Sequence, residues 1–420
     1  MSTQKKLSLI FTVILFIFSF ISLTSRPAET KPIVIGVSGD YSGPGAAYGA
    51  GVTNGLLDHL RWINNLGGIE YKDRQTGQLK RNEMKILWED NATSPSKSLS
   101  IYKRFKAAGI QLIYIHGSGP GEAVSPSLSR DKIPGIVYGY ASPAGYRPDP
   151  LYYCAKYGTI IEGCVTMVKW FLTTWKESRP PKMGVMVGDS PSWRVIADPH
   201  GTKAEVEKMG VEWVGVEFMP MMTTDLSVQI TRVMQKQVDL IGFFGINTHT
   251  TVMAKDMLKL GFDPKKVKVI CNGSGWDETL LRTIPKEGEG FIGEQPVVLT
   301  SEDVPGVRLA KKVAQWRGRK DEEVKGDYLH GFVLGYFLEA ALKKALEEVG
   351  ADEITPTDIR NSLFHLKDVD VGGLTPKTSV VDPNYPVLNQ YYMYTKMEGG
   401  QFKALPPKWV EMERVQYGRR

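Results

Sequence analysis

Short apolar runs alternate with amphipathic stretches of helical period along most of the chain. In the first half the runs are Ile33–Val37, Met84–Trp88, Ile110–Ile115 and Gly135–Tyr138. A stretch of helical period follows the first run and ends at Gly67 and Gly68, and Ser94 with Pro95 predicts the capped start of another helix. This alternation is typical of a parallel sheet covered by crossover helices.

The same rhythm restarts near residue 182. The runs are Lys182–Val187, Val211–Phe218, Leu240–Phe244 and Val267–Cys271, and stretches of helical period lie near 193–209, 226–236 and 250–260. Later segments predict helices over Val304–Trp316, Tyr328–Val349 and Thr357–Leu366, and a strand pair near Gln390–Thr395. Two doubly wound α/β lobes account for this order with the fewest assumptions.

Composition agrees with two folded lobes and narrows the partners. The chain has 420 residues, of which 42% are hydrophobic and 23% charged, values close to those of globular proteins. Its net charge of +6 is spread among many acids and forms no basic stripe, so we expect no nucleic-acid partner.

The three cysteines indicate neither a metal site nor a redox site. Cys154, Cys164 and Cys271 form no C-x-x-C pair, so we expect no metal and no cofactor. The simplest interpretation is that they are small buried hydrophobic residues. In an oxidising compartment Cys154 and Cys164 could instead form a disulfide, and the sequence leaves both readings open.

The first 25 residues have the features of a secretory signal peptide. Lys5 and Lys6 precede the apolar run Leu7–Leu23, and small residues up to Ser25 follow. No cysteine lies near the end of the run, so we expect a soluble periplasmic protein that is exported and is not a lipoprotein. The alternative is an uncleaved N-terminal anchor.

Three motifs carry a resemblance to a known family. They are IVIGVSGDYSGPGAAYG at 33–49 with a helix ending in INNLGGI at 63–69, WEDNATSP at 88–95, and YLHGFVLGYFLEAAL at 328–342. With them the chain resembles the type I periplasmic solute-binding proteins of ABC importers, the leucine/isoleucine/valine-binding protein family. The resemblance covers essentially all of the chain after the leader.

The resemblance implies two Rossmann-like lobes joined by three hinge crossings. The crossings are expected at Tyr153–Lys156, Glu294–Pro296 and Gly372–Thr375. The N-terminal lobe would comprise 31–154 and 295–372, and the C-terminal lobe 155–294 and 373–407. Such a protein closes on a small-molecule ligand in the cleft between its lobes and delivers it to the permease and ATPase subunits of an importer, with no catalytic residue.

One turn is the first candidate for ligand binding. Gly117–Glu122 follows the strand that ends at His116, and its amides with the next helix N-terminus could hold a carboxylate. The alternative is a tight turn that merely needs glycine. In the resembling family a serine here holds the ligand carboxylate, and the aligned position is Gly119, with Ser118 beside it and Gly121 in the same turn.

Further candidates lie at other predicted strand ends. The resemblance gives Ala141 and Ser142 backbone and hydroxyl contacts to the ligand, and it makes Tyr48 and Trp193 aromatic walls. The set of candidate ligand-binding residues is completed by Asn247 and Ser274, which follow the next two strands.

The position expected for an amine-binding acid differs from the family pattern. Relatives that bind α-amino acids place an acid after the strand that here ends at Cys271, where this chain has Gly273. Asp277 and Glu278 come later and suit the first turn of a helix. A ligand ammonium without a carboxylate would be costly, so we expect an amphipathic carboxylate or amide, with a branched-chain amino acid as the alternative.

Two other functions are open to a chain with this pattern. An α/β enzyme is disfavoured because no G-x-S-x-G, complete G-x-G-x-x-G or H-E-x-x-H motif is present, and lone histidines such as His116 and His249 are more often structural than catalytic. A ligand-sensing receptor domain of the same fold is the other. No second membrane span or signalling module appears before Arg420, so we expect the free carrier.

Overall fold

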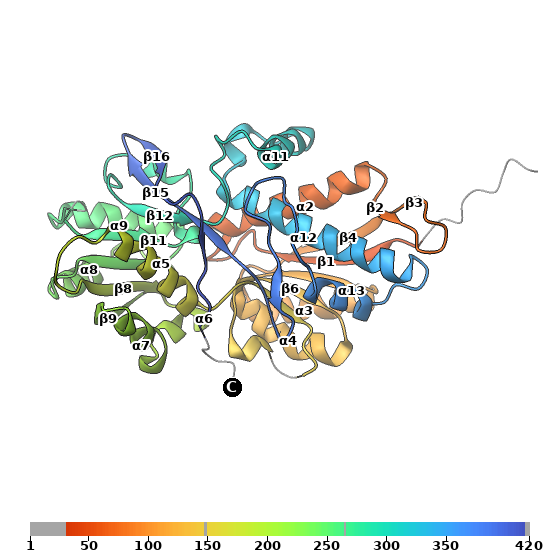
Figure 1. Cartoon of the computed structure of the whole chain (residues 1–420), viewed down its shortest axis with the longest axis horizontal. Helices are drawn as coiled ribbons and strands as arrows, with labels where there is room; N and C mark the ends of the chain where they lie inside the picture. Colours follow the sequence, from red (N-terminus) through yellow and green to blue (C-terminus); the bar gives the residue numbers. More distant parts are fainter. Residues whose placement is uncertain (1–30, 147–148, 264–265, 416–420) are drawn as a thin grey trace, which may run out of the picture.

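The computed structural model describes residues 31–146, 149–263 and 266–415. The predicted signal peptide, 1–25, lies outside the described residues. The chain forms two lobes side by side, each with a central sheet and helices on both faces (Figure 1). The predicted α/β class with two doubly wound lobes is confirmed.

The first lobe is built on a seven-stranded sheet of order β13-β14-β7-β6-β5-β1-β4. Its neighbouring strands are parallel except for β13 and β14. The strands are β1 (Ile33–Gly39), β4 (Met84–Asp90), β5 (Leu112–His116), β6 (Gly135–Tyr140), β7 (Tyr153–Tyr157), β13 (Val380–Asp382) and β14 (Tyr385–Leu388).

Helices cover both faces of this sheet because its strands are apolar on both sides. On β5, Leu112 and Tyr114 face the core that contains α2 and α12, and Ile113 and Ile115 face the core that contains α3 and α4. The helices are α2 (Ala46–Asn65), α3 (Pro95–Ala107), α4 (Ser118–Asp131), α11 (Pro305–Trp316), α12 (Gly326–Val349) and α13 (Pro356–Phe364). Ser94 caps α3, as predicted, by accepting a hydrogen bond from the Lys97 amide.

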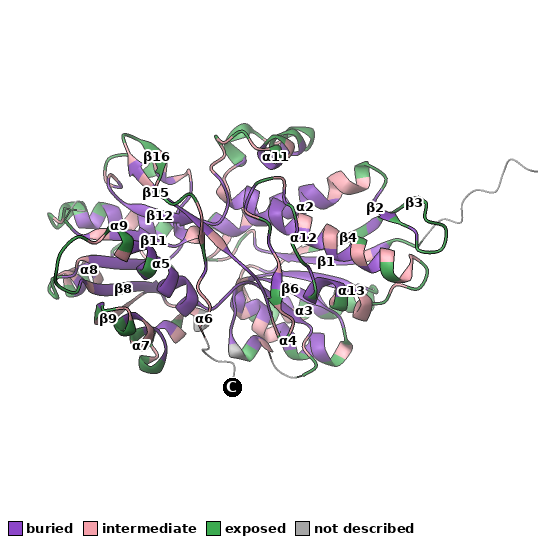
Figure 2. Ribbon diagram, viewed as in Figure 1, coloured by how far each residue is buried: buried purple, intermediate pink, exposed green. Residues whose placement is uncertain are grey.

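The second lobe has an eight-stranded sheet of order β16-β15-β12-β11-β10-β8-β9, to which β17 adds by pairing with β15. Its strands are β8 (Lys182–Gly188), β9 (Glu212–Met219), β10 (Leu240–Phe244), β11 (Lys268–Cys271), β12 (Ile292–Gln295), β15 (Tyr391–Glu398), β16 (Gln401–Ala404) and β17 (Val410–Glu411). Its helices are α5 (Ile160–Thr174), α6 (Pro191–Arg194), α7 (Ala204–Lys208), α8 (Ser227–Met234), α9 (Asn247–Lys259) and α10 (Leu280–Thr283). In both lobes the central strands are buried, and the edge strands and outer helix faces are more exposed (Figure 2).

One segment differs from its predicted form, and another that had no predicted element forms a hairpin. The predicted helix over 193–209 is broken into α6, a 3₁₀ turn, a π turn and α7, because Pro199 cannot donate to the preceding turn and Asp198 caps the new start. The polar stretch 70–83 is largely the hairpin of β2 (Ile69–Lys72) and β3 (Leu79–Asn82).

The strand order of the two sheets shows where the chain passes from one lobe to the other. The first follows β7, at Gly158 and Thr159, directly after the expected Tyr153–Lys156, which is itself a strand of the first sheet. The second follows β12, near the expected Glu294–Pro296.

The third crossing is not at Gly372–Thr375. Gly372 and Gly373, at φ of 67° and 79°, form a turn in which the Gly372 carbonyl accepts a hydrogen bond from the Gly306 amide. The chain then pairs with β7 through β14 and crosses at Asn389 and Gln390. Residues 373–388, which we assigned to the C-terminal lobe, therefore belong to the first lobe, where β13 and β14 complete its sheet.

The described part of the chain contains no disulfide. Cys154, Cys164 and Cys271 are buried free thiols, so of the two interpretations left open by the sequence, the structure has the unpaired cysteines and not the Cys154–Cys164 disulfide. Among the helices that the structure describes, none combines the length and the apolar character needed to cross a membrane.

Candidate ligand-binding site

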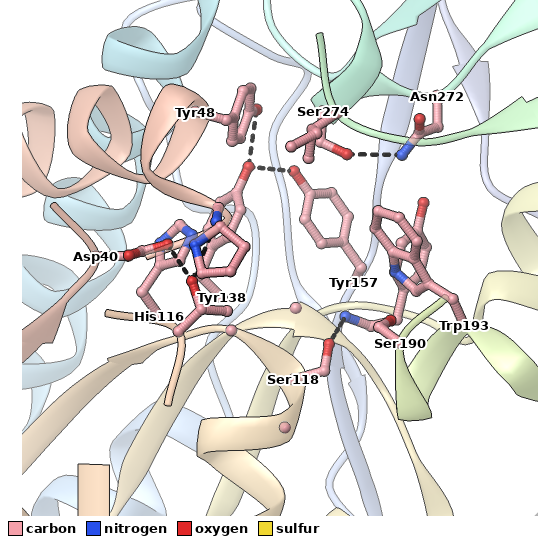
Figure 3. A pocket seen from close by; sticks show the side chains of 18 of the residues that line it. Asp40, Tyr48, His116, Ser118, Tyr138, Tyr157, Ser190, Trp193, Asn272 and Ser274 are labelled. Atoms are coloured by element: carbon pink, nitrogen blue, oxygen red, sulfur yellow. Dashed lines mark hydrogen bonds between the residues drawn. The ribbon is translucent and has the colours of Figure 1, made fainter. Parts of the chain in front are cut away.

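A cavity of about 320 Å³ lies between the two lobes (Figure 3). Both sheets point the carboxyl ends of their parallel strands toward it, which is where ligands of open α/β sheets bind. The first lobe contributes Asp40, Pro44, Gly45, Tyr48, Thr93, Pro95, His116–Pro120, Tyr138–Tyr140 and Tyr157, and the second lobe Asp189, Ser190, Trp193, Met221, Ile246, Asn272–Ser274, Glu294, Pro296 and Tyr392.

Five of the nine predicted site residues line this cavity. They are Tyr48, Ser118, Gly119, Trp193 and Ser274. Trp193 comes from the second lobe and meets the Tyr140 ring of the first lobe edge to face, with 6.4 Å between ring centroids. The cavity therefore has aromatic walls on both sides.

Gly121 and Ala141 do not line the cavity. The Gly121 amide donates to the Gly117 carbonyl 3.0 Å away, and so it is the first intrahelical donor of α4 rather than a free one. The Ala141 amide donates to the carbonyls of Tyr157 and Gly158 at 3.1 and 3.0 Å. These backbone hydrogen bonds of Gly121 and Ala141 support the start of α4 and the end of β6 from behind the cavity lining.

Ser142 and Asn247 also lie outside the cavity lining. The Ser142 hydroxyl accepts a hydrogen bond from the Ala144 amide at 3.3 Å. The Asn247 side chain donates to Asp277 at 2.7 Å, and Asp277 also accepts from the Thr279 amide at the start of α10. Asp277 thus has the helix-start role that its sequence position indicated.

The turn before α4 presents donors to the cavity. Gly117, at φ 98°, allows the chain to reverse after β5, and its own amide donates to the Tyr138 carbonyl. The next two amides, of Ser118 and Gly119, are the first of the helix and have no carbonyl one turn earlier. The Ser118 hydroxyl accepts from the Tyr140 amide at 3.1 Å, which leaves its proton to be donated elsewhere.

A cluster of phenols forms the first-lobe floor. The Tyr138 hydroxyl lies 2.9 Å from that of Tyr48 and 2.7 Å from that of Tyr157 (Figure 3). Tyr48 and Tyr138 both hydrogen-bond to His330 Nδ1. Burial raises the pKa of all three phenols and lowers that of His330, so the cluster is neutral. It offers hydrogen bonds without charge.

The two histidines singled out in the sequence have different positions. His116 lines the cavity, stacks on Tyr138 with ring centroids 5.0 Å apart, and hydrogen-bonds to the Tyr114 hydroxyl. Burial lowers its pKa to about 4, so it is neutral at pH 7. His249 lies outside the lining and bonds to the Ile246 amide and the Pro220 carbonyl, a structural role.

On the second lobe, the polar side chains that follow β11 hydrogen-bond to each other and to the backbone at the end of β10. Asn272 accepts from the Gly245 amide at 2.9 Å and donates to the Ser274 hydroxyl at 2.7 Å, and Ser274 donates to the Gly245 carbonyl at 2.9 Å. These bonds fix the loop from Asn272 to Ser274 against β10.

A carboxyl group lies where the sequence predicted none. Gly273 stands at the position where an acid was expected, but Glu294 from the neighbouring β12 lines the cavity and accepts from the Gly273 amide at 3.3 Å. The premise that this part of the cleft lacks an acid is therefore wrong. Adjacent strands bring together residues that are far apart in sequence, so the alignment of one strand could not show this.

The comparisons with known proteins agree with this architecture. The family model described as periplasmic binding protein matches residues 32–401. A Leu/Ile/Val-binding protein homolog 1 of Brucella abortus is 21% identical over 231 residues. This match covers 54% of the chain and 58% of the relative, so the chain spans little more than half the length of the curated relatives it matches.

Solved structures show the same fold over nearly the whole chain. A substrate-binding protein of an ABC transporter from Aeropyrum pernix is 20% identical with a TM-score of 0.76, covering 92% of this chain and 98% of that one. A branched-chain amino acid ABC transporter protein from Thermus thermophilus with bound valine is 18% identical with a TM-score of 0.75, covering 93% and 98%. A solute-binding protein from Rhodopseudomonas palustris in complex with p-hydroxybenzoic acid is 20% identical with a TM-score of 0.74, covering 91% and 98%.

Proposed function

The chain belongs to the periplasmic binding protein family, and from that premise we propose that it captures a small molecule between its lobes and delivers it to an ABC importer. One observation carries the proposal: the cavity takes its walls from both lobes, so a ligand that touches both favours the closed arrangement. No step of this function requires catalysis.

The cavity supports a ligand with a carboxylate and an apolar body. The amides of Ser118 and Gly119 with the N-terminus of α4 suit the carboxylate, and Tyr48 and Trp193 suit the body. Valine and p-hydroxybenzoic acid, which are bound by two of the structural relatives, both combine these features.

Capture and delivery also require a location and partners. The Lys5–Lys6 pair and the apolar run after it support export to the periplasm. The partners in this proposal are the membrane permease and ATPase subunits of an importer of the branched-chain amino acid type. Each lobe would contribute part of the docking face, so only the closed form would present the whole of it.

Thermal shift with a panel of branched-chain amino acids, aliphatic and aromatic carboxylates and amides tests capture. A ligand bound only by the native state raises the melting temperature. X-ray scattering with the tightest-binding compound should then show a smaller radius of gyration, since the lobes rotate about the crossings. An unchanged radius at saturation would refute hinge closure, and no shift with any compound would refute capture of this ligand class.

A further inference from the structure

We propose that Glu294 is a recognition group for a positively charged nitrogen of the ligand. The inference rests on the proposed function, because it concerns the chemistry of the molecule captured in the same cavity. It replaces the expectation that the ligand lacks an amino group.

Glu294 is buried but incompletely bonded. Its side chain is 1% exposed and lines the cavity. One carboxyl oxygen accepts from the Gly273 amide at 3.3 Å, and the other has no hydrogen-bond partner. In the part of the chain that the structure describes, no lysine or arginine forms an ion pair with it. A buried carboxylate without a counter-charge is costly, so the empty site favours the protonated carboxyl group, and a cationic ligand can take the place of that proton.

The other two acids that line the cavity already have partners. Asp40 accepts from the Thr93 hydroxyl at 2.6 Å and from the Gly43 amide at 3.2 Å. Asp189 holds both nitrogens of the Arg194 fork at 2.6 and 2.8 Å. Glu294 is therefore the acid in the lining with an oxygen left for a ligand.

The titratable groups that interact electrostatically with Glu294 carry no charge that would compete with a ligand cation. They lie on β6, β7, β11, β15 and α5, and they are Tyr140, Tyr157, Cys271, Tyr392, Tyr394 and Cys164. Burial raises the pKa of every one of them, so all are neutral between pH 6 and 8. A cationic nitrogen here would meet one carboxylate among neutral groups, with no competing positive charge in the lining.

The position of the donors on α4 restricts the ligand further. The α4 amides belong to the first lobe and Glu294 to the second, so an ammonium and a carboxylate on one molecule would connect the two lobes. Glu294 also lies two residues before Pro296, on the strand that leads into the second crossing. A ligand nitrogen would therefore contact the hinge directly.

Binding of a cation here must depend on pH. Burial raises the pKa of Glu294 to about 8, so the empty site holds a proton at pH 6 that an ammonium ligand has to displace. With a pKa of about 8, the dissociation constant of an amine should fall roughly 50-fold as the pH rises from 6 to 8, and about one proton should be released per ligand at pH 7. Lys156, beside Tyr157, titrates in the same range, so the profile alone does not identify the group.

Isothermal titration with matched pairs and Glu294→Gln tests the proposal. The pairs are L-leucine with 4-methylpentanoate, L-phenylalanine with 3-phenylpropanoate, and 4-(aminomethyl)benzoate with 4-methylbenzoate. At pH 8 at least one amine should bind about ten-fold or more tighter than its nitrogen-free partner. Glu294→Gln, which keeps the acceptor for the Gly273 amide, should weaken that amine by about 30-fold or more and abolish its pH dependence. The nitrogen-free acid should change less than about three-fold.

Glu398→Gln, on the half-exposed end of the neighbouring strand, is the matched control and should leave every affinity unchanged. Nitrogen-free acids that bind at least as tightly as the amines would overturn the inference while leaving the capture function intact. A preference for amines that survives in Glu294→Gln would assign the nitrogen to another group. If none of the six probes binds, the inference is refuted for amino acids and aminomethyl benzoates. The scattering and thermal-shift tests then decide separately whether the protein captures a ligand.

Discussion

Replacing Lys156 with methionine measures the energetic consequence of a charge buried between the lobes. Lys156 is 2% exposed on β7, just before the first crossing, and its ammonium donates to Gln390 at the third crossing, 3.0 Å away. The rings of Tyr157 and Phe337 lie 5.6 and 5.7 Å from it. Burial lowers its pKa from 10.5 to about 7.

The lowered pKa sets both the sign and the size of the effect. Between pH 7 and 10.5 the unfolded chain binds a proton that the native state does not, so Lys156 makes the free energy of unfolding rise with pH by about 1.4 kcal/mol per unit. Below pH 7 the native state carries the full cost of burying the charged ammonium. That cost is about 5 kcal/mol, from the 3.5 units between the pKa of 10.5 and the pKa of about 7. Methionine removes the penalty but leaves the Gln390 oxygen without its donor, at about 1–3 kcal/mol. We expect Lys156→Met to be more stable by about 2–4 kcal/mol at pH 6, with the gain falling to zero between about pH 8 and pH 10 and changing sign above that, because the cost at Gln390 does not depend on pH.

Urea unfolding followed by tryptophan fluorescence at pH 6, 7, 8 and 9 gives the comparison. The free energies of wild type and Lys156→Met should converge as the pH rises. Lys255→Met, at an exposed position of α9, should stay within about 0.5 kcal/mol of wild type at every pH. If Lys156→Met is less stable at pH 6, or if the two pH profiles run parallel, the charge is compensated in the native state and the reasoning fails.

Three further outcomes are expected. Trp193→Ala should weaken the tightest-binding panel compound by about 2–4 kcal/mol in isothermal titration, because a large aromatic wall of the cavity is lost; a change below two-fold would remove Trp193 from the site. Ser118→Ala should cost about 1–2 kcal/mol of binding, and more than Ser142→Ala, whose hydroxyl bonds behind the wall; the reverse order would move the carboxylate to Ser142. N-terminal sequencing of the periplasmic fraction should find a start between Ser25 and Lys31, and recovery of intact chain only in membranes would show an anchor.

Local patterns in the sequence were enough to predict most of the parallel strands and most of the helices, whereas β7 and β12 were expected only as crossings between the lobes. The run Leu240–Phe244 is β10 residue for residue, and the predicted cap at Ser94 begins α3. The helix α5 was not predicted. Ile160–Phe171 is apolar and buried on nearly every side, and such a run is hard to tell from a buried strand by its pattern alone.

The candidate site was predicted less completely, because residues that lie far apart in the sequence meet in it. Single strand ends indicated Tyr48, Ser118 and Trp193, which do line the cavity. The phenols of Tyr138 and Tyr157 and the carboxyl of Glu294 become part of the site only through the order of the strands. The third crossing, which the resemblance placed at Gly372–Thr375, was misplaced because the pairing of β14 with β7 keeps the chain in the first lobe as far as Leu388.

The three unpaired thiols allow local opening of the protein to be measured from their rates of chemical labelling. Cys154 lies in the first sheet, Cys271 in the second, and Cys164 on α5, and burial raises the pKa of all three, that of Cys154 to about 12. Only a thiolate reacts at an appreciable rate, so a labelling reagent added to the folded protein must wait until each thiol meets water. The labelling rates of Cys154 and Cys271 would thus report separately how often each sheet opens, without any introduced probe, and a bound ligand should slow both.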